Sequence, residues 1–374
     1  MHFVIDENIP YAEQFFAHMG SIERVNGREL AARQLKNADI LLVRSVTQVN
    51  QELLAEAEHL RFVGTATIGT DHVDQDYLKQ RGIRFSSAPG CNRISVAEYV
   101  LSALLVVAER QQLDLRDLSL GIVGVGNIGR ELSSKATALG MKLLLCDPPR
   151  ARAGDTGPFI SHQQLLWDAD IISYHVPLTP AETQDGTFHL LGASELNSLT
   201  GKKILVNSSR GEVWDNRALL ARQMGGEPLN LVMDVWESEP DILQDLIPHT
   251  QLATPHIAGY SLEGKARGTE ILYRAVCDCL GMPTELSLQP LLPEPEISTV
   301  RVRGVLGPEQ QQKLMQLVYD VRQDDARFRA QVANPGGFDR LRKTYPVRRE
   351  LSSLRLEGVE NDRRAQLQEL GFYL

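Results

Sequence analysis

The chain has 374 residues, of which 43% are hydrophobic and 6% aromatic, so it can bury more than one hydrophobic core. It carries 48 acidic against 39 basic residues, a formal net charge of −9, which argues against a nucleic-acid partner because phosphate backbones bind concentrated basic surfaces. The longest strongly apolar run, residues 99–108, is shorter than the roughly 20 residues that cross a bilayer. We therefore expect neither a nucleic-acid partner nor a membrane partner.

The start of the chain and its cysteines indicate the compartment. Residues 1–7 lack a basic segment followed by an apolar one, so no signal peptide is visible. Four cysteines are scattered along the chain, and Cys277 and Cys279 lack the two-residue gap of usual zinc ligands. We interpret all four as thiols, and we expect a cytoplasmic protein without a metal.

The first 95 residues alternate short apolar runs with segments of helical pattern. Strands are predicted at 3–5, 40–43 and 62–63, and helices at 10–19, 29–36 and 51–58. This alternation is typical of a parallel sheet with helices on its faces. Residues 95–112 predict one long helix, with Ser95 as its N-cap and Glu98 completing a capping box.

A second series of strands begins near residue 118. Apolar runs at 120–123, 142–145, 171–174, 203–206 and 230–235 predict a doubly wound sheet. After residue 281 four prolines interrupt the pattern, and helices are predicted across 308–330 and 361–370. The fold class is therefore α/β, with two doubly wound, Rossmann-type parallel-sheet domains and a C-terminal α+β domain.

A glycine-rich turn follows the first strand of the second series and opens a predicted helix. Its glycines have separate roles: Gly124 permits the tight turn, Gly126 lets a pyrophosphate approach the backbone, and Gly129 lets helix and strand pack closely. Free N–H groups at the helix N-terminus would hold the phosphates. The predicted dinucleotide-binding residues of this turn are Gly124, Gly126, Asn127, Ile128 and Gly129. A turn in a fold that has lost its ligand is the alternative.

The next strand ends at Asp147, 18 residues beyond Gly129. A carboxylate there can accept hydrogen bonds from the ribose hydroxyls and would repel a 2′-phosphate, which favours NAD over NADP. Arg150 lies close enough to leave NADP as an alternative.

Three polar segments end later strands of the same sheet, where ligands collect in doubly wound folds. Oxidising a secondary alcohol needs a base for the hydroxyl proton, which suits His256. It also needs a cation for a substrate carboxylate, which suits the planar fork of Arg210. Glu239, if hydrogen-bonded to His256, would orient the ring and stabilise the imidazolium.

The ordered set G-x-G-x-x-G, N-x-x-R-G, D-V-x-x-x-E-P and P-H-I-A-G resembles the D-isomer-specific 2-hydroxyacid dehydrogenases over roughly residues 1–282. Segments 67–74, 88–92, 146–149 and 256–265, and a C-terminal extension of this length, resemble a branch that acts on a phosphorylated sugar acid. The resemblance implies a substrate-binding domain of residues 1–95 and 256–282 and an NAD-binding domain of 96–255, with an active-site cleft between them. It also implies a dimerisation domain of 283–374 that forms a homodimer.

The resemblance also implies roles for individual residues. Arg210, Glu239 and His256 would be catalytic, with His256 the proton donor and acceptor. The further cofactor-binding residues would be Asp147, Val176, Asp234 and Gly259, and the substrate-binding residues would be Ser45, Thr67 and Tyr260. Two positions depart from the pattern: Arg93 and Val176 stand where small residues are usual, and Val176 loses a side-chain hydrogen bond to NAD.

Several alternatives remain at this point. Another activity of the family, on 3-phosphoglycerate or on glyoxylate and hydroxypyruvate, is one alternative, and an NAD-sensing corepressor is a second. Arg44 ends a strand of the first domain, where it is either solvated or in contact with a substrate phosphate. His72, between Asp71 and Asp74, is interpreted as a loop residue rather than a metal ligand. The basic cluster of Arg340, Arg342, Lys343, Arg348 and Arg349 is interpreted as a solvated face, with an anion site that reaches a neighbouring subunit's cleft as the alternative.

Overall fold

The structure is a computed structural model that describes all 374 residues, and it divides into two compact units. Unit 1 comprises residues 1–92 and 262–293, and unit 2 comprises residues 93–261 and 294–374. This division differs from the three domains expected from the sequence. Residues 256–261 belong to unit 2, because Asp234 of that unit binds the backbone N–H groups of Ile257 and Ala258. The C-terminal segment, residues 294–374, belongs to unit 2 as well, through contacts described below.

Unit 1 contains a five-stranded parallel sheet in the order β2-β1-β3-β4-β5. Its strands are β1 (His2–Asp6), β2 (Ser21–Val25), β3 (Ile40–Val43), β4 (Phe62–Thr65) and β5 (Arg84–Ser86). The three predicted strands are the three central ones, which are buried on both faces. The two edge strands, β2 and β5, were missed because they are only partly buried and so show no continuous apolar run.

The helices of unit 1 are α1 (Ala12–Phe16), α2 (Gln75–Gln80) and α9 (Leu262–Leu280). Residues 51–58 form turns instead of the predicted helix, and the prediction at 29–36 is reduced to a short 3-10 helix, Ala32–Leu35. Helix α9 packs against the sheet, where a Cβ added to Gly64 on β4 would lie 2.9 Å from the Leu272 side chain. Glycine at position 64 therefore lets the helix approach the strand closely.

Unit 2 contains a six-stranded parallel sheet in the order β11-β10-β9-β8-β6-β7. After β7 the chain crosses to the other side of β6, so the order in which strands are added reverses there. Its strands are β6 (Ser119–Val123), β7 (Lys142–Cys146), β8 (Ile171–Tyr174), β9 (Ile204–Asn207), β10 (Asn230–Met233) and β11 (Leu252–Ala253). The five predicted strands are confirmed, and the two-residue β11 was missed because it is too short to give a pattern. All six carboxyl ends lie at one edge of the sheet, where a doubly wound fold binds its ligands.

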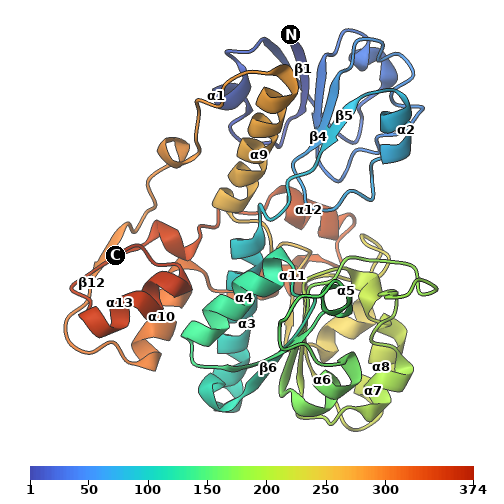
Figure 1. The fold of residues 1–374 in the computed structure, drawn as a ribbon. Helices are drawn as coiled ribbons and strands as arrows, with labels where there is room; N and C mark the ends of the chain where they lie inside the picture. The colour runs from blue at the N-terminus through green and yellow to red at the C-terminus, as the bar shows by residue number, and fades with distance from the viewer. The chain divides into compact units, whose positions relative to one another are not determined.

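Helices cover both faces of this sheet (Figure 1). One face carries α3 (Arg93–Gln111) and α4 (Asn127–Ala138), and the other carries α6 (His162–Asp168), α7 (Ala193–Ser198) and α8 (Asn216–Met224). The predicted capping box is wrong: α3 begins at Arg93, so Ser95 and Glu98 lie inside the helix and are buried. Glu98 instead accepts a hydrogen bond from the Leu351 N–H and pairs with Lys135.

The C-terminal segment contains a two-stranded parallel sheet and four helices. They are β12 (Thr299–Arg301), β13 (Arg355–Glu357), α10 (Pro308–Val318), α11 (Arg322–Gln331), α12 (Gly337–Lys343) and α13 (Asn361–Leu370). The single helix predicted across 308–330 is broken at Tyr319, whose backbone is extended. The Ser102 hydroxyl of α3 holds this break, since it donates a hydrogen bond to the Tyr319 carbonyl and accepts one from the Val321 N–H. The predicted helix at 361–370 is confirmed by α13.

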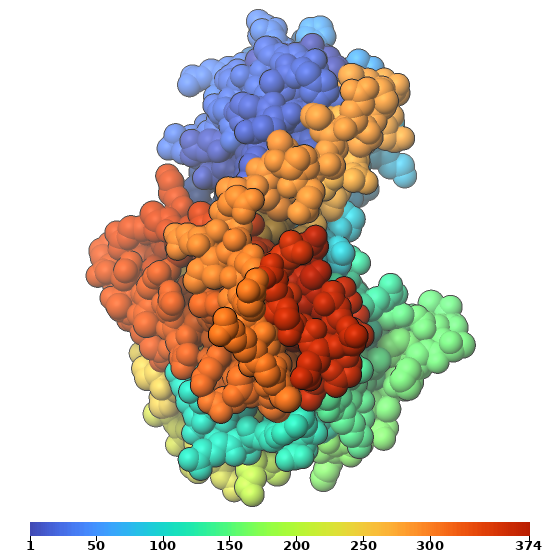
Figure 2. Space-filling model, turned by 90° about the vertical axis from the view of Figure 1, so that its left-hand side faces the viewer, coloured from blue at the N-terminus to red at the C-terminus, as the bar shows by residue number.

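This segment shares a hydrophobic core with α3 and α4. Met315, Leu351, Leu367 and Leu370 are buried in one cluster with Leu104 of α3 and other residues of those helices. Figure 2 shows the segment, coloured orange to red, packed against the teal residues of α3 and the following strand. The structure contains no helix of the length and apolarity that spanning a membrane would require.

Candidate active site

The glycine-rich turn has the geometry that a dinucleotide needs. Gly124 has a φ of +90°, which suits glycine, and a Cβ on Gly129 would lie 2.2 Å from the Gly124 carbonyl oxygen. A Cβ on Gly126, by contrast, would have no heavy atom within 4 Å, so the space in front of this backbone is open. The turn therefore leaves room for a pyrophosphate at the N-terminus of α4. Val176 lies beside it, 2.8 Å from where a Gly124 Cβ would be.

Asp147 follows β7 and is tied to the same turn. One carboxylate oxygen accepts a hydrogen bond from the Val125 N–H at 2.8 Å, and the other accepts from the Arg150 N–H at 3.0 Å at the start of α5 (Pro148–Arg152). Arg150 donates to the Val125 carbonyl at 2.6 Å and pairs with Asp155. The guanidinium of Arg150 is therefore already engaged with the backbone and a carboxylate, which leaves Asp147 to set the charge of this position.

Arg210 lies three residues beyond β9, on a turn that Asn207 organises. The Asn207 side chain accepts hydrogen bonds from the N–H and hydroxyl of Ser209 and donates to the Arg210 carbonyl. The next residue, Gly211, is in close contact with the turn after β10, since a Cβ there would lie 1.9 Å from the Trp236 carbonyl oxygen. Only glycine permits this approach. The residue after Arg210 therefore contacts the turn that leads to Glu239.

His256 and Glu239 form a hydrogen-bonded pair. His256 Nδ1 lies 2.7 Å from Glu239 Oε2, and the Trp236 N–H holds the other carboxylate oxygen at 2.9 Å. Burial alone would raise the pKa of Glu239, but the charge of His256, the hydrogen bond to it and the charge of Arg342 lower that pKa below its usual value. An ionised Glu239 therefore faces one ring nitrogen, and Nε2 is the nitrogen left for a substrate. The hydrogen bond predicted from the sequence is present.

The segment that carries His256 is held by Asp234. This carboxylate accepts hydrogen bonds from the Thr254 hydroxyl and from the N–H groups of Ile257 and Ala258, all between 2.7 and 2.9 Å. Burial raises the pKa of Asp234, and the charge of His256 and these bonds oppose the rise. His256 itself has a φ of +57°, an uncommon conformation for a non-glycine residue that persists only where surrounding contacts impose it.

The C-terminal segment supplies residues near this pair that sequence reasoning missed. Arg342 of α12 lies over the Tyr260 ring, 5.8 Å from its centroid, and its charge acts on Glu239. Arg348 is buried and donates to the carbonyls of Ser95 and Ala258. The interpretation of this basic cluster as a solvated face is therefore wrong for both residues, although Arg340 and Lys343 are exposed. No local pattern distinguishes the buried arginines from the exposed ones.

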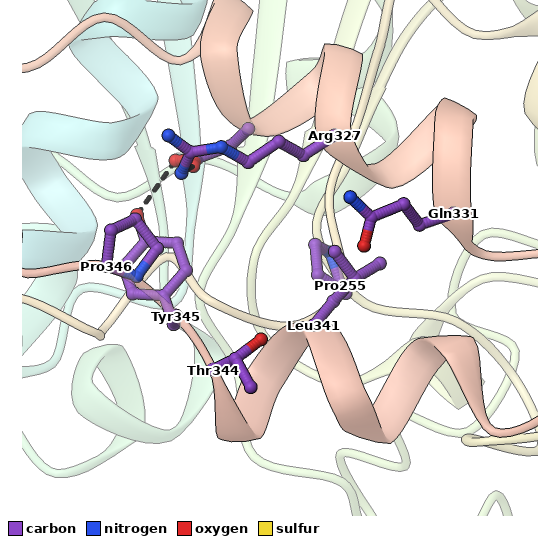
Figure 3. A pocket seen from close by; sticks show the side chains of 8 residues that line it. Pro255, Arg327, Gln331, Leu341, Thr344, Tyr345 and Pro346 are labelled. Atoms are coloured by element: carbon purple, nitrogen blue, oxygen red, sulfur yellow. Dashed lines mark hydrogen bonds and ion pairs between the residues drawn. The ribbon is translucent and has the colours of Figure 1, made fainter.

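A pocket of about 230 Å³ lies where the C-terminal segment meets the residue before His256. Its lining residues are Pro255, Asp324, Arg327, Gln331, Leu341, Thr344, Tyr345 and Pro346 (Figure 3). The Tyr345 hydroxyl donates to Asp324 at 2.8 Å across its wall. Pro255 lines the pocket and His256 does not. The pocket therefore lies among the residues that hold the segment carrying His256, and not at the His256 side chain.

The expected substrate residues of unit 1 follow the central strands of its sheet. Ser45 is exposed two residues after β3, and Thr67 lies two residues after β4. The Thr67 hydroxyl donates a hydrogen bond to the Gly69 carbonyl and shares another with the Thr65 hydroxyl. The Thr65 hydroxyl is in turn hydrogen-bonded to His72 Nε2 at 3.0 Å. His72 is thus a buried residue that orders this loop.

Arg93, one of the two departures from the family pattern, pairs with Glu131 of α4 at 3.4 Å.

One group of side chains has a spacing that metal ions favour. Ligand atoms of His189, Asp215 and Glu237 lie within 4.8 Å of one another. His189 Nε2 and Glu237 Oε1 are 2.5 Å apart, however, and the other Glu237 oxygen accepts from the Asn216 N–H. These groups satisfy one another, so the cluster fixes the turn before Glu239 without requiring an ion.

Comparisons with known proteins agree with this geometry. A family model described as "D-isomer specific 2-hydroxyacid dehydrogenase, NAD binding domain" matches residues 105–258, and a domain of unknown function, DUF3410, matches residues 291–371. Erythronate-4-phosphate dehydrogenase of Aeromonas salmonicida is 56% identical over 362 residues, 96% of each chain. The relative of the same name from Tolumonas auensis is 53% identical over 372 residues, 100% of this chain and 99% of the relative.

Solved structures share the fold. The TT0316 protein of Thermus thermophilus is 26% identical with a TM-score of 0.65, over 75% of this chain and 97% of that one. D-lactate dehydrogenase of Aquifex aeolicus, solved with NAD and lactic acid, is 24% identical with a TM-score of 0.61, over 75% and 96% of the two chains.

Proposed function

Because the chain belongs to the D-isomer specific 2-hydroxyacid dehydrogenase family and uses NAD, we propose that it oxidises 4-phospho-D-erythronate. The product is 2-oxo-3-hydroxy-4-phosphobutanoate, and the reaction serves vitamin B6 biosynthesis. The observation that carries this proposal is the His256–Glu239 pair, at the same sheet edge as Arg210 and the open glycine turn, in a chain that matches its relatives from end to end.

The side chains divide the work of the reaction. NAD, held at the glycine turn and Asp147, would supply the acceptor for the hydride that leaves C2 of the substrate. His256 Nε2 accepts the proton of the 2-hydroxyl group, and ionised Glu239 stabilises the imidazolium that forms. The guanidinium of Arg210 binds the substrate carboxylate and polarises the forming carbonyl.

The other predicted site residues fit this scheme. We propose that the turn residues Gly124, Gly126, Asn127, Ile128 and Gly129, together with Asp147, Val176, Asp234 and Gly259, form the cofactor site. Asp234 would act there largely by holding residues 257–258 in place. We propose Ser45, Thr67 and Tyr260 as substrate-binding residues. Ser45 and Thr67 follow strand ends of unit 1, and Tyr260 lies four residues beyond His256.

Turnover with a panel of acids tests this function. NADH formation by the purified protein is measured by absorbance with 4-phospho-D-erythronate and 3-phospho-D-glycerate, and NADH consumption with glyoxylate and hydroxypyruvate. We expect kcat/KM to favour 4-phospho-D-erythronate over the shorter phosphorylated acid by about 100-fold, the discrimination that one missing carbon unit gives in a fitted site. Equal or better turnover of an unphosphorylated acid contradicts the proposal, and NADP replacing NAD contradicts the role of Asp147.

We also propose that the protein is a cytoplasmic homodimer formed through residues 283–374, as the family resemblance implies. The segment exposes apolar side chains that a partner could cover, among them Val305 and Val347, each more than two-thirds exposed. Light scattering after size-exclusion chromatography is expected to give twice the 41.6 kDa of one chain. Val305→Asp with Val347→Asp is expected to shift the mass toward one chain, while Trp167→Asp, at an exposed position outside the segment, leaves it unchanged. A wild-type mass of one chain contradicts the dimer.

A further inference from the structure

Two cations of unit 1 lie at the carboxyl ends of its central strands. Arg44 follows β3 directly. In the register of the sheet Val43 lies opposite Thr65, and the Ala66 N–H donates to the Val43 carbonyl at 2.9 Å. Arg44 is therefore placed beside the residues that lead from β4 to Thr67.

Lys265 reaches the same edge from helix α9. This helix runs antiparallel to β4: Leu272 packs on Gly64, and one turn earlier a Cβ on Gly268 would lie 3.0 Å from the Ala66 carbonyl oxygen. Residues three and four apart lie on one face of a helix, so Lys265 is on this face and a further turn toward Thr67. The helix is fixed there because Arg267 Nε donates to the Cys91 carbonyl at 2.9 Å.

The two side chains act on each other. Burial lowers the pKa of Lys265, and the positive charge of Arg44 lowers it further, to about 8. Two like charges held together in a half-buried site destabilise each other, and an anion placed between them removes that repulsion. A phosphate dianion suits the pair, since an arginine offers two parallel N–H donors and a lysine offers a compact charge.

We propose that Arg44 and Lys265 bind the distal phosphate of the substrate, with the backbone and hydroxyl of Thr67 at the edge of the site. This inference rests on the proposed function and adds to it the residues that select a phosphorylated acid. The signal was partly visible in the sequence, where Arg44 ends a strand, but Lys265 is brought to it only by the packing of α9 on β4.

Selectivity between a phosphorylated and an unphosphorylated substrate tests the site. We would measure kcat/KM for 4-phospho-D-erythronate and for D-erythronate with wild type, Lys265→Met, Lys265→Arg and Arg44→Gln, and with Lys79→Met as an exposed cation on α2 of the same unit. We expect Lys265→Met and Arg44→Gln each to lower the value for the phosphorylated acid by about 10- to 100-fold, the effect of losing one charged hydrogen bond. The value for D-erythronate should change less than about twofold, and Lys265→Arg should recover most of the loss. Lys79→Met should match wild type.

Equal losses on both substrates would overturn the proposal, because they indicate a structural role. Inorganic phosphate provides a second measurement that does not depend on turnover. We expect wild type to bind it in calorimetric titration and both variants to bind it at least about 10-fold more weakly. If wild type binds phosphate through these residues but does not oxidise 4-phospho-D-erythronate, the proposed function fails and the site stands. If wild type oxidises that acid and the variants keep full selectivity, the site fails and the function stands.

Discussion

Replacing His256 by Asn is expected to lower kcat by about 1,000-fold, within the range that a general base contributes, while NAD affinity changes little. Asparagine is the chosen replacement because it tolerates the positive φ of this position, so the backbone held by Asp234 is preserved. The imidazole is lost as the proton acceptor, but the glycine turn and Asp147, which form the proposed cofactor site, are untouched. Stopped-flow NADH formation and fluorescence titration of NAD measure the two effects separately.

Glu239→Gln serves as the companion variant. It keeps the size of the side chain but removes the negative charge beside His256 Nδ1, so we expect a smaller fall in kcat than for His256→Asn. Because the folded-state pKa of Glu239 lies below its usual value, the contribution of its charge to stability is present above about pH 4.5 and is lost only in stronger acid. A His256→Asn protein that keeps more than a tenth of wild-type kcat would rule out His256 as the proton acceptor.

The proposed site could be located from the sequence because its residues follow strand ends. In a parallel sheet every carboxyl end meets one edge, so the topology that short apolar runs already reveal places Arg210, Glu239 and His256 after strands that end at the same edge. The glycine turn is equally local, since its geometry depends on residues within one strand–turn–helix unit. These parts of the site needed no knowledge of distant contacts.

The parts that could not be predicted depend on packing between distant segments. Ser95 and Glu98 match a capping box, but Glu98 is used by Leu351 and Lys135 instead. Arg348 and Arg340 look alike in the sequence, yet one is buried and the other exposed. Neither periodicity nor composition shows which surface a segment more than 200 residues away will cover.

This packing links the C-terminal segment to the catalytic loop. Arg348 donates to the Ala258 carbonyl, and the Ser261 hydroxyl donates to Glu350 at 2.8 Å, so both ends of residues 258–261 are held by that segment. Asp234 holds the loop from the sheet side. The segment therefore supports the loop that follows the proposed catalytic residue His256, in addition to the role at a subunit interface that we propose.

A buried ionic cluster beneath this contact is the second place where a single substitution should have a large effect. Lys135 of α4 is 1% exposed and donates to the Leu370 carbonyl, and its Nζ lies 3.6 Å from carboxylates of both Glu98 and Glu131. Burial raises the pKa of Glu98 to about 8, although Lys135 opposes the rise. The pair thus joins α3, α4 and α13 at a point from which water is excluded.

At pH 8.5, above the Glu98 pKa of about 8, we expect Lys135→Met to lower the free energy of unfolding by about 3–5 kcal/mol, because the buried carboxylate loses its cation. At pH 5.5 Glu98 is protonated, so we expect a smaller loss of about 1–3 kcal/mol from the Leu370 carbonyl, which loses its donor. Glu98→Gln should be tolerated better, and at pH 8.5 it should rescue Lys135→Met in the double variant, since no carboxylate charge is then left buried at position 98. Between about pH 4.5 and 8 the folded protein retains the Glu98 proton, while the unfolded chain has released it. Wild-type stability therefore falls as pH rises through this window. Glu98→Gln removes this part of the fall. Urea unfolding of the four proteins at pH 5.5 and 8.5, at one protein concentration, measures these differences. A loss below about 1 kcal/mol for Lys135→Met at pH 8.5, or a double variant no more stable than it at that pH, would show that the cluster does not hold the C-terminal segment in place.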